Sequence, residues 1–110
     1  MTAELALALP MLLAVTAGLA WLLAVGVAQV RTVDAARETA RALARGDDRS
    51  AAVAVGQRVA PAGVRISISR SDGRIVVHAQ GRMGGPGGLF AALPGAHLDA
   101  EAVALEEEPP

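Results

Sequence analysis

The chain has 110 residues, of which 53% are hydrophobic, and its formal net charge is −1. This near-neutral charge gives no electrostatic attraction for nucleic acid or an acidic partner, and the lack of cysteine excludes disulfides and thiolate chemistry. Aromatic residues make up 2% of the chain, and the apolar residues gather in one stretch. The remainder is therefore poor in large core side chains, which predicts one small domain attached to an apolar segment.

The apolar stretch covers residues 5–28 and carries no charge. As a helix it would be about 36 Å long, enough to cross a hydrocarbon core of about 30 Å with some tilt. We therefore expect a transmembrane helix over residues 1–30. A secretory signal peptide is the alternative, because residues 26–28 (Gly-Val-Ala) resemble a cleavage site. However, the stretch lacks a basic start and exceeds the usual apolar core of about 7–15 residues.

Two residues interrupt this segment. Pro10 removes a backbone hydrogen bond and predicts a helix kink. Glu4 is the only charged side chain before Arg31. Its carboxylate either rests among the lipid headgroups or is compensated by a partner, as intramembrane carboxylates tend to be.

An amphipathic stem follows the apolar segment over residues 31–46, and Gly46 ends it. No glycine or proline separates the two parts, so one continuous helix is expected. A spacing of 100° per residue places the charges on one side and small or apolar residues on the other. The charged side contains Arg31, Asp34, Arg37, Glu38, Arg41 and Arg45, and the opposite side contains Thr32, Ala36, Thr39, Ala40 and Leu43. The charged stripe is either a solvated face or a subunit contact.

Residues 47–110 are expected to form a small α+β head. Asp47 or Asp48 caps a short helix over residues 49–59, which stops at Ala60-Pro61. Alternating apolar residues over 64–69 and a strand over 75–80, joined at Asp72-Gly73, predict a β-hairpin. Residues 98–105 supply a third strand, because a lone hairpin is marginally stable. A glycine-rich connector over 81–88 and an acidic tail complete the head.

The residues that could carry chemistry form no recognisable active site. His78 and His97 lack the spacing of metal ligands, and no Gly-x-Ser-x-Gly elbow is present. The glycine-rich stretch lacks the Gly-Lys-Ser/Thr of a phosphate-binding loop. We therefore expect no enzyme, with no catalytic, cofactor-binding or metal-binding residues and no small-molecule substrate.

The string TAELALALP resembles the N-terminal motif of TadE-like proteins, minor pilin-like components of tight-adherence (Flp) pilus systems. VDAARETARALARGDD is similar to the stem of actinobacterial members, and the Ala/Glu-rich finish is similar too. The resemblance covers most of the chain and is strongest over residues 2–48. It implies a pilin-like fold, with a long transmembrane and stem helix, then a short helix and a small antiparallel sheet.

The resemblance also implies a structural role in the biogenesis of a type IV-like pilus used in cell adhesion. Glu4 would act in assembly and processing, with its carboxylate meeting the N-terminal amine of a neighbouring subunit. The partners would be other pilin-like subunits, the inner-membrane assembly platform and membrane lipid. A basic leader ending in glycine would precede the mature start, so translation is expected to begin upstream of Met1 unless processing differs.

For localisation, the resemblance implies a single-pass protein of the cytoplasmic membrane with a cytoplasmic N-terminus and an extracytoplasmic head. The arginines after the span, taken alone, would keep that side cytoplasmic. A secreted or membrane-anchored binding module or accessory subunit unrelated to pili is the alternative function.

Overall fold

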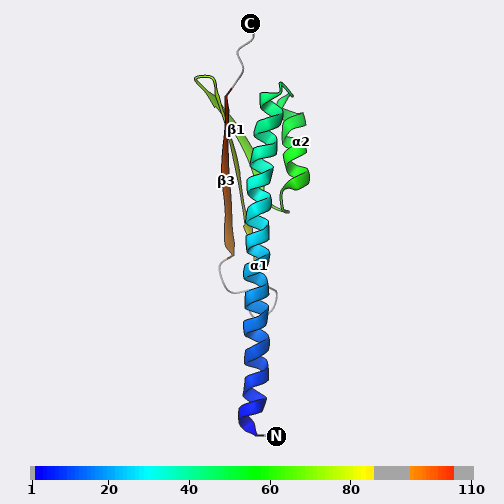
Figure 1. The fold of residues 1–110 in the computed structure, drawn as a ribbon, viewed down its shortest axis with the longest axis vertical. Helices are drawn as coiled ribbons and strands as arrows, with labels where there is room; N and C mark the ends of the chain where they lie inside the picture. Colours follow the sequence, from blue (N-terminus) through cyan, green and yellow to red (C-terminus); the bar gives the residue numbers. More distant parts are fainter. Residues whose placement is uncertain (1, 86–94, 106–110) are drawn as a thin grey trace.

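A computed structural model describes residues 2–85 and 95–105. Two helices precede three strands: α1 (Ala3–Ala44), α2 (Arg49–Val59), β1 (Arg65–Ser71), β2 (Arg74–Met83) and β3 (Ala96–Leu105). The molecule measures 78 × 20 × 19 Å. Figure 1 shows α1 running along most of this length, with α2 and the sheet beside its C-terminal part. The predicted α+β class, with a long N-terminal helix, a short helix and a small antiparallel sheet, is confirmed.

The helix α1 is continuous from the apolar segment through the stem. It ends where Gly46 takes a φ of 99°, a conformation that glycine adopts without steric cost. The Gly46 amide donates to the Leu43 carbonyl at 3.0 Å, and the Asp47 amide donates to the Ala42 carbonyl at 3.1 Å. These two bonds satisfy carbonyls at the helix end, in the pattern expected of a glycine C-cap.

The second helix begins and ends where local signals place it. The Asp48 carboxylate accepts a hydrogen bond from the Ala51 amide at 2.9 Å, so Asp48 is the N-cap. Asp47 pairs with Arg45 instead, at 3.1 Å. Ala60 adopts an extended conformation, as expected for a residue that precedes a proline.

The three strands form one antiparallel sheet in the order β1-β2-β3. Asp72 and Gly73 both have positive φ, 51° and 74°, which is the geometry of a two-residue hairpin turn. Alternate residues of β2 and β3 point toward α1, and the buried ones are Ile75, Val77, Ala79, Leu98 and Ala100. The predicted third strand is present as β3. It pairs with β2, so β2 has a neighbouring strand on each side.

The strand β2 extends further than the sequence predicts. Gly81 and Met83 belong to β2, whereas the pattern assigned them to the connector over 81–88. A Cβ at Gly81 would lie 2.8 Å from the Gly63 carbonyl oxygen and 2.9 Å from the Val64 Cα. Glycine is therefore needed at this position for close backbone approach rather than for a flexible linker. Residues 86–88 of that connector and the acidic tail over 106–110 lie outside the described residues.

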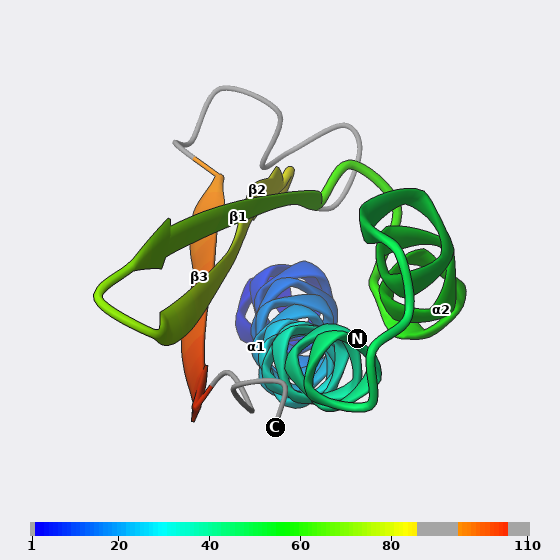
Figure 2. The same ribbon diagram turned by 90° about the horizontal axis from the view of Figure 1, so that it is seen from above.

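The core lies between the stem part of α1, α2 and the inner face of the sheet. Figure 2 shows α1 between α2 and the sheet. The buried side of the stem consists of small residues, including Ala35, Ala36, Thr39, Ala40 and Ala42. At Gly56, α2 comes so close that a Cβ would lie 2.0 Å from Thr39 Oγ1. Small side chains on both helices therefore determine the separation of α1 and α2.

Candidate membrane anchor and its junction with the head

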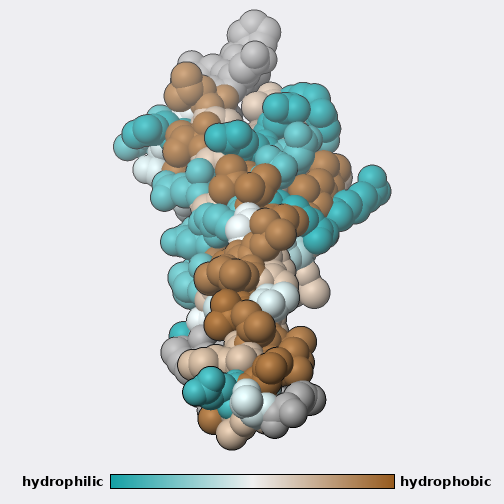
Figure 3. All heavy atoms as spheres, turned by 60° about the horizontal axis from the view of Figure 1, so that its bottom comes forward, coloured by the Kyte–Doolittle hydropathy of each residue, from teal (hydrophilic) through white to brown (hydrophobic). Residues whose placement is uncertain are grey.

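The N-terminal half of α1 exposes large apolar side chains. Leu7 is 74% exposed and Leu23 is 71% exposed, and many of their apolar neighbours are similarly uncovered. In the most apolar 18-residue window of α1, only 6% of the residues are buried. Figure 3 shows hydrophobic side chains dominating the helical end and hydrophilic ones gathering on the head. By length and apolar composition, α1 is able to cross a membrane. A signal sequence near the N-terminus meets the same criteria of length and composition.

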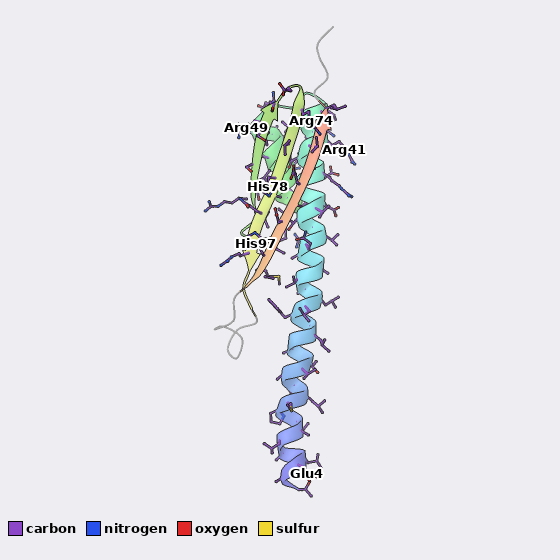
Figure 4. The ribbon with its side chains drawn as sticks, turned by 90° about the vertical axis from the view of Figure 1, so that its left-hand side faces the viewer. Glu4, Arg41, Arg49, Arg74, His78 and His97 are labelled. Carbon is purple, nitrogen blue, oxygen red and sulfur yellow. The ribbon has the colours of Figure 1, made fainter. Side chains whose placement is uncertain are left out.

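Glu4 lies in the first turn of α1 with its side chain exposed. A carboxylate at this end interacts favourably with the helix dipole. No described residue forms an ion pair with it, and Figure 4 shows it at the tip of the molecule, away from the labelled head residues. Along the helix, Arg31 is the next charged residue, about 40 Å away at about 1.5 Å per residue. Within residues 2–85 and 95–105, no oppositely charged side chain lies near this tip of α1.

Within the exposed half, the hydroxyl group of Thr16 is satisfied by the helix itself. Thr16 Oγ1 donates to the Leu12 carbonyl at 2.8 Å, which leaves no free hydroxyl proton facing outward. The helix continues through Pro10, which cannot donate to the carbonyl of Ala6. A kink at Pro10 stays a prediction.

Side chains from α1 tie the helix to the head at its lower end. Trp21 Nε1 donates to the Gly84 carbonyl at 2.9 Å, just after β2. Gln29 donates to the Asp99 carbonyl at 2.6 Å and accepts from the Asp99 amide at 3.2 Å. Gln29 thereby pairs with the backbone of β3 at the open edge of the sheet, as a neighbouring strand would.

Sequence reasoning missed this junction, because Trp21 and Gln29 both fell inside the span predicted over residues 1–30. Their polar groups offered a signal: a tryptophan N–H usually finds a hydrogen-bond partner, and tryptophan is common at membrane surfaces. The burial of Ala28 shows that the head already covers the helix within that span. From Ala3 to Trp21 the helix rises about 27 Å, close to the hydrocarbon thickness of about 30 Å. The part of α1 below the junction therefore has the length of one membrane crossing.

A groove of about 520 Å³ lies beside this junction. Its apolar walls come from α1, through Leu23 and Val27, and from the head, through Pro61, Met83 and Leu98. Arg31 lines it too, and Arg31 Nε donates to the Val59 carbonyl at 3.1 Å. The groove thus combines an apolar wall with a guanidinium that α2 holds in place.

The two histidines lie on neighbouring strands of the sheet. His78 on β2 is half-buried, and its Nε2 contacts Asp99 Oδ1 on β3. His97 is exposed near the start of β3, two residues before Asp99, and it lies below His78 in Figure 4. Within residues 2–85 and 95–105, no group of three His, Asp or Glu side chains is placed to hold a metal ion.

Comparison with family models, curated proteins and solved structures finds no significant match to this chain. The resemblance of residues 2–48 to TadE-like proteins therefore stays a prediction, and the functional interpretation rests on the residues of this chain.

Proposed function

We propose that this chain is a membrane-anchored structural subunit of a tight-adherence, type IV-like pilus, acting as a TadE-like minor pilin. One observation carries the proposal: a single helix is apolar and uncovered over about 27 Å, has Glu4 at its tip, and continues as the stem of a small head. Uncovered apolar surface of this extent calls for lipid or other subunits around it. A pilus supplies both in turn, first the membrane and then the packed helices of the fibre.

In this proposal the chain crosses the cytoplasmic membrane once, with Glu4 at the cytoplasmic side and the head outside. A reporter fused after Pro110 in the full-length gene is expected to be active only outside the cytoplasm. Activity on the cytoplasmic side would contradict the pilus role. Intact-mass analysis of the mature protein tests the secreted alternative, because removal of residues 1–28 would show a product without the exposed helix.

Glu4 provides the sharper test of assembly. The Glu4→Gln variant should insert into the membrane at least as well as the wild type, because an amide costs less than a carboxylate in an apolar setting. Pilus number should nevertheless fall, since the amide forms no ion pair with an amine of a neighbouring subunit. Glu4→Asp should be intermediate, because it keeps the charge with a shorter reach.

Glu101→Gln is the matched control, since Glu101 is an exposed carboxylate on β3, far from the helix tip. Membrane fractionation and pilus counts at equal expression compare the four proteins. Equal piliation by the wild type and both Glu4 variants would show that the carboxylate merely rests among headgroups and would remove its assembly role.

A further inference from the structure

We propose that the groove beside the junction binds one anionic phospholipid, with an acyl chain against its apolar wall and the lipid phosphate on Arg31. The inference rests on the proposed membrane insertion of α1 but does not depend on the pilus role. Its basis is the order of residue types along the groove: apolar side chains line the end near the membrane segment, and the guanidinium of Arg31 lies at the far end.

The position of the groove along α1 suits a phospholipid from the adjacent leaflet. The helix wall of the groove begins at Ala20, next to Trp21, where the head first contacts α1 through a hydrogen bond. From Ala20 to Arg31 the helix rises about 16 Å away from the membrane segment. A phospholipid from the adjacent leaflet would therefore enter with its chains pointing back to the bilayer and its phosphate toward Arg31.

The charge of the groove also suits an anionic ligand. Among the described residues that line it, Arg31 is the one charged side chain, so no carboxylate opposes an anion there. Its Nε is used by the Val59 carbonyl, which fixes the guanidinium and leaves the terminal nitrogens for a ligand. Guanidinium groups bind phosphate oxygens through charge-assisted hydrogen bonds, and holding the group in advance reduces the entropy lost on binding.

The size of the groove favours a lipid chain over a helix from a second copy. A helix segment about 10 Å wide and about 16 Å long occupies more than about 1,200 Å³, whereas all the empty space of the groove, its open mouth included, is about 930 Å³. A second copy shifted to place its Glu4 on this Arg31 would also lay its apolar helix along the charged stem beyond it. That arrangement would bury exposed arginines such as Arg37 and Arg41 against leucines.

Native mass spectrometry of the full chain in detergent tests the inference with phosphatidylglycerol and phosphatidylcholine that carry identical oleoyl chains. The wild type is expected to bind one phosphatidylglycerol about tenfold more tightly than phosphatidylcholine, in line with one charge-assisted contact. Arg31→Gln should remove that preference. Arg37→Gln makes the same change on an exposed stem residue outside the groove and should keep the preference within about twofold.

A second variant tests the apolar wall without changing charge. Ala24 lines the groove, and Ala24→Leu should fill part of it and weaken both lipids by about tenfold, since it competes for the space of the chain. Circular dichroism checks that each variant stays folded. Glycerophosphoglycerol, the headgroup alone, should bind at least about 100-fold more weakly than the lipid, because it buries no chain.

Three results would overturn the inference: equal loss in Arg31→Gln and Arg37→Gln, headgroup binding as tight as lipid binding, or a dimer that excludes lipid. The first would mean general charge attraction, the second a phosphate site, and the third an interface between copies. Alkaline extraction of membranes measures insertion separately. A wild-type protein that is inserted but shows no preference for phosphatidylglycerol therefore contradicts the lipid site and leaves the proposed function standing.

Discussion

The two halves of α1 differ in whether their side chains are covered by the rest of the chain. The C-terminal half buries small side chains, and Ala35 and Ala42 are completely covered by the head. The N-terminal half leaves its leucines uncovered, although a leucine offers far more apolar area than an alanine. Close packing of α2 and the sheet selects small residues in the stem, whereas the uncovered leucines need partners outside this chain. The same helix thus serves as a core element at one end and presents an uncovered apolar surface at the other.

Breaking the apolar half should have the largest effect. Leu12 and Leu13 are exposed, and replacing both with arginine costs about 3 kcal/mol per site on the membrane-insertion scale. The double variant Leu12→Arg/Leu13→Arg should be released from membranes by alkaline extraction while its head stays folded. The control places two arginines at exposed positions of α2, Ala51→Arg/Ala54→Arg, and should remain in the membrane. Equal extraction of the two double variants would contradict the anchoring of this half.

A glycine-to-alanine exchange in each region sharpens the comparison. Gly56→Ala should lower the free energy of unfolding of the head by about 1–3 kcal/mol, because its Cβ would collide with Thr39 Oγ1 and press on the Ala35 carbonyl. Gly18→Ala has no atom within 4 Å of the new Cβ and should leave head stability unchanged. Denaturant titration followed by Trp21 fluorescence in detergent measures both. A loss at Gly18 as large as that at Gly56 would mean that the two halves are not energetically distinct.

The junction between the halves should contribute an intermediate amount. Gln29→Ala removes both hydrogen bonds to the Asp99 backbone and should cost about 1–2 kcal/mol. Hydrogen exchange at the Asp99 amide is expected to speed up, because that edge position of β3 is then open to water. Gln57→Ala, which removes one contact of 3.4 Å to the Val64 carbonyl, serves as the weaker comparison. Unchanged exchange at Asp99 would exclude Gln29 as the partner of this strand edge.

The smallest effect is expected on the charged stripe of the stem. Glu38 and Arg41 lie 3.2 Å apart, and their side chains are 37% and 66% exposed. Glu38→Gln should change the unfolding free energy by less than about 0.5 kcal/mol, because water screens an exposed pair. Thermal unfolding of the head at low and high salt measures this. A loss above 1 kcal/mol would show that the stripe contacts something beyond solvent.

Much of the fold follows from sequence signals that act within a few residues and do not depend on distant segments of the chain. Asp48 and the Ala60-Pro61 pair set the ends of α2, and Gly46 ends α1, because capping and proline effects act within a few residues. The turn at Asp72-Gly73 is equally local, since two residues with positive φ suffice to reverse the strand. Of the candidate site, Glu4 and the apolar segment could be identified from the sequence, because charge and hydrophobicity are properties of the sequence itself.

The tertiary structure alone decided where the head meets the helix. Gln29 pairs with Asp99, which lies 70 positions away, and Trp21 pairs with Gly84, 63 positions away. No local pattern specifies such contacts, because they depend on how α1 and the sheet settle against each other. The same holds for Gly81, whose place in β2 follows from the nearby Gly63 and Val64 backbone rather than from its glycine-rich neighbours. Helix length and turn positions are therefore set by short-range sterics, whereas the junction and its groove arise from close packing of distant segments.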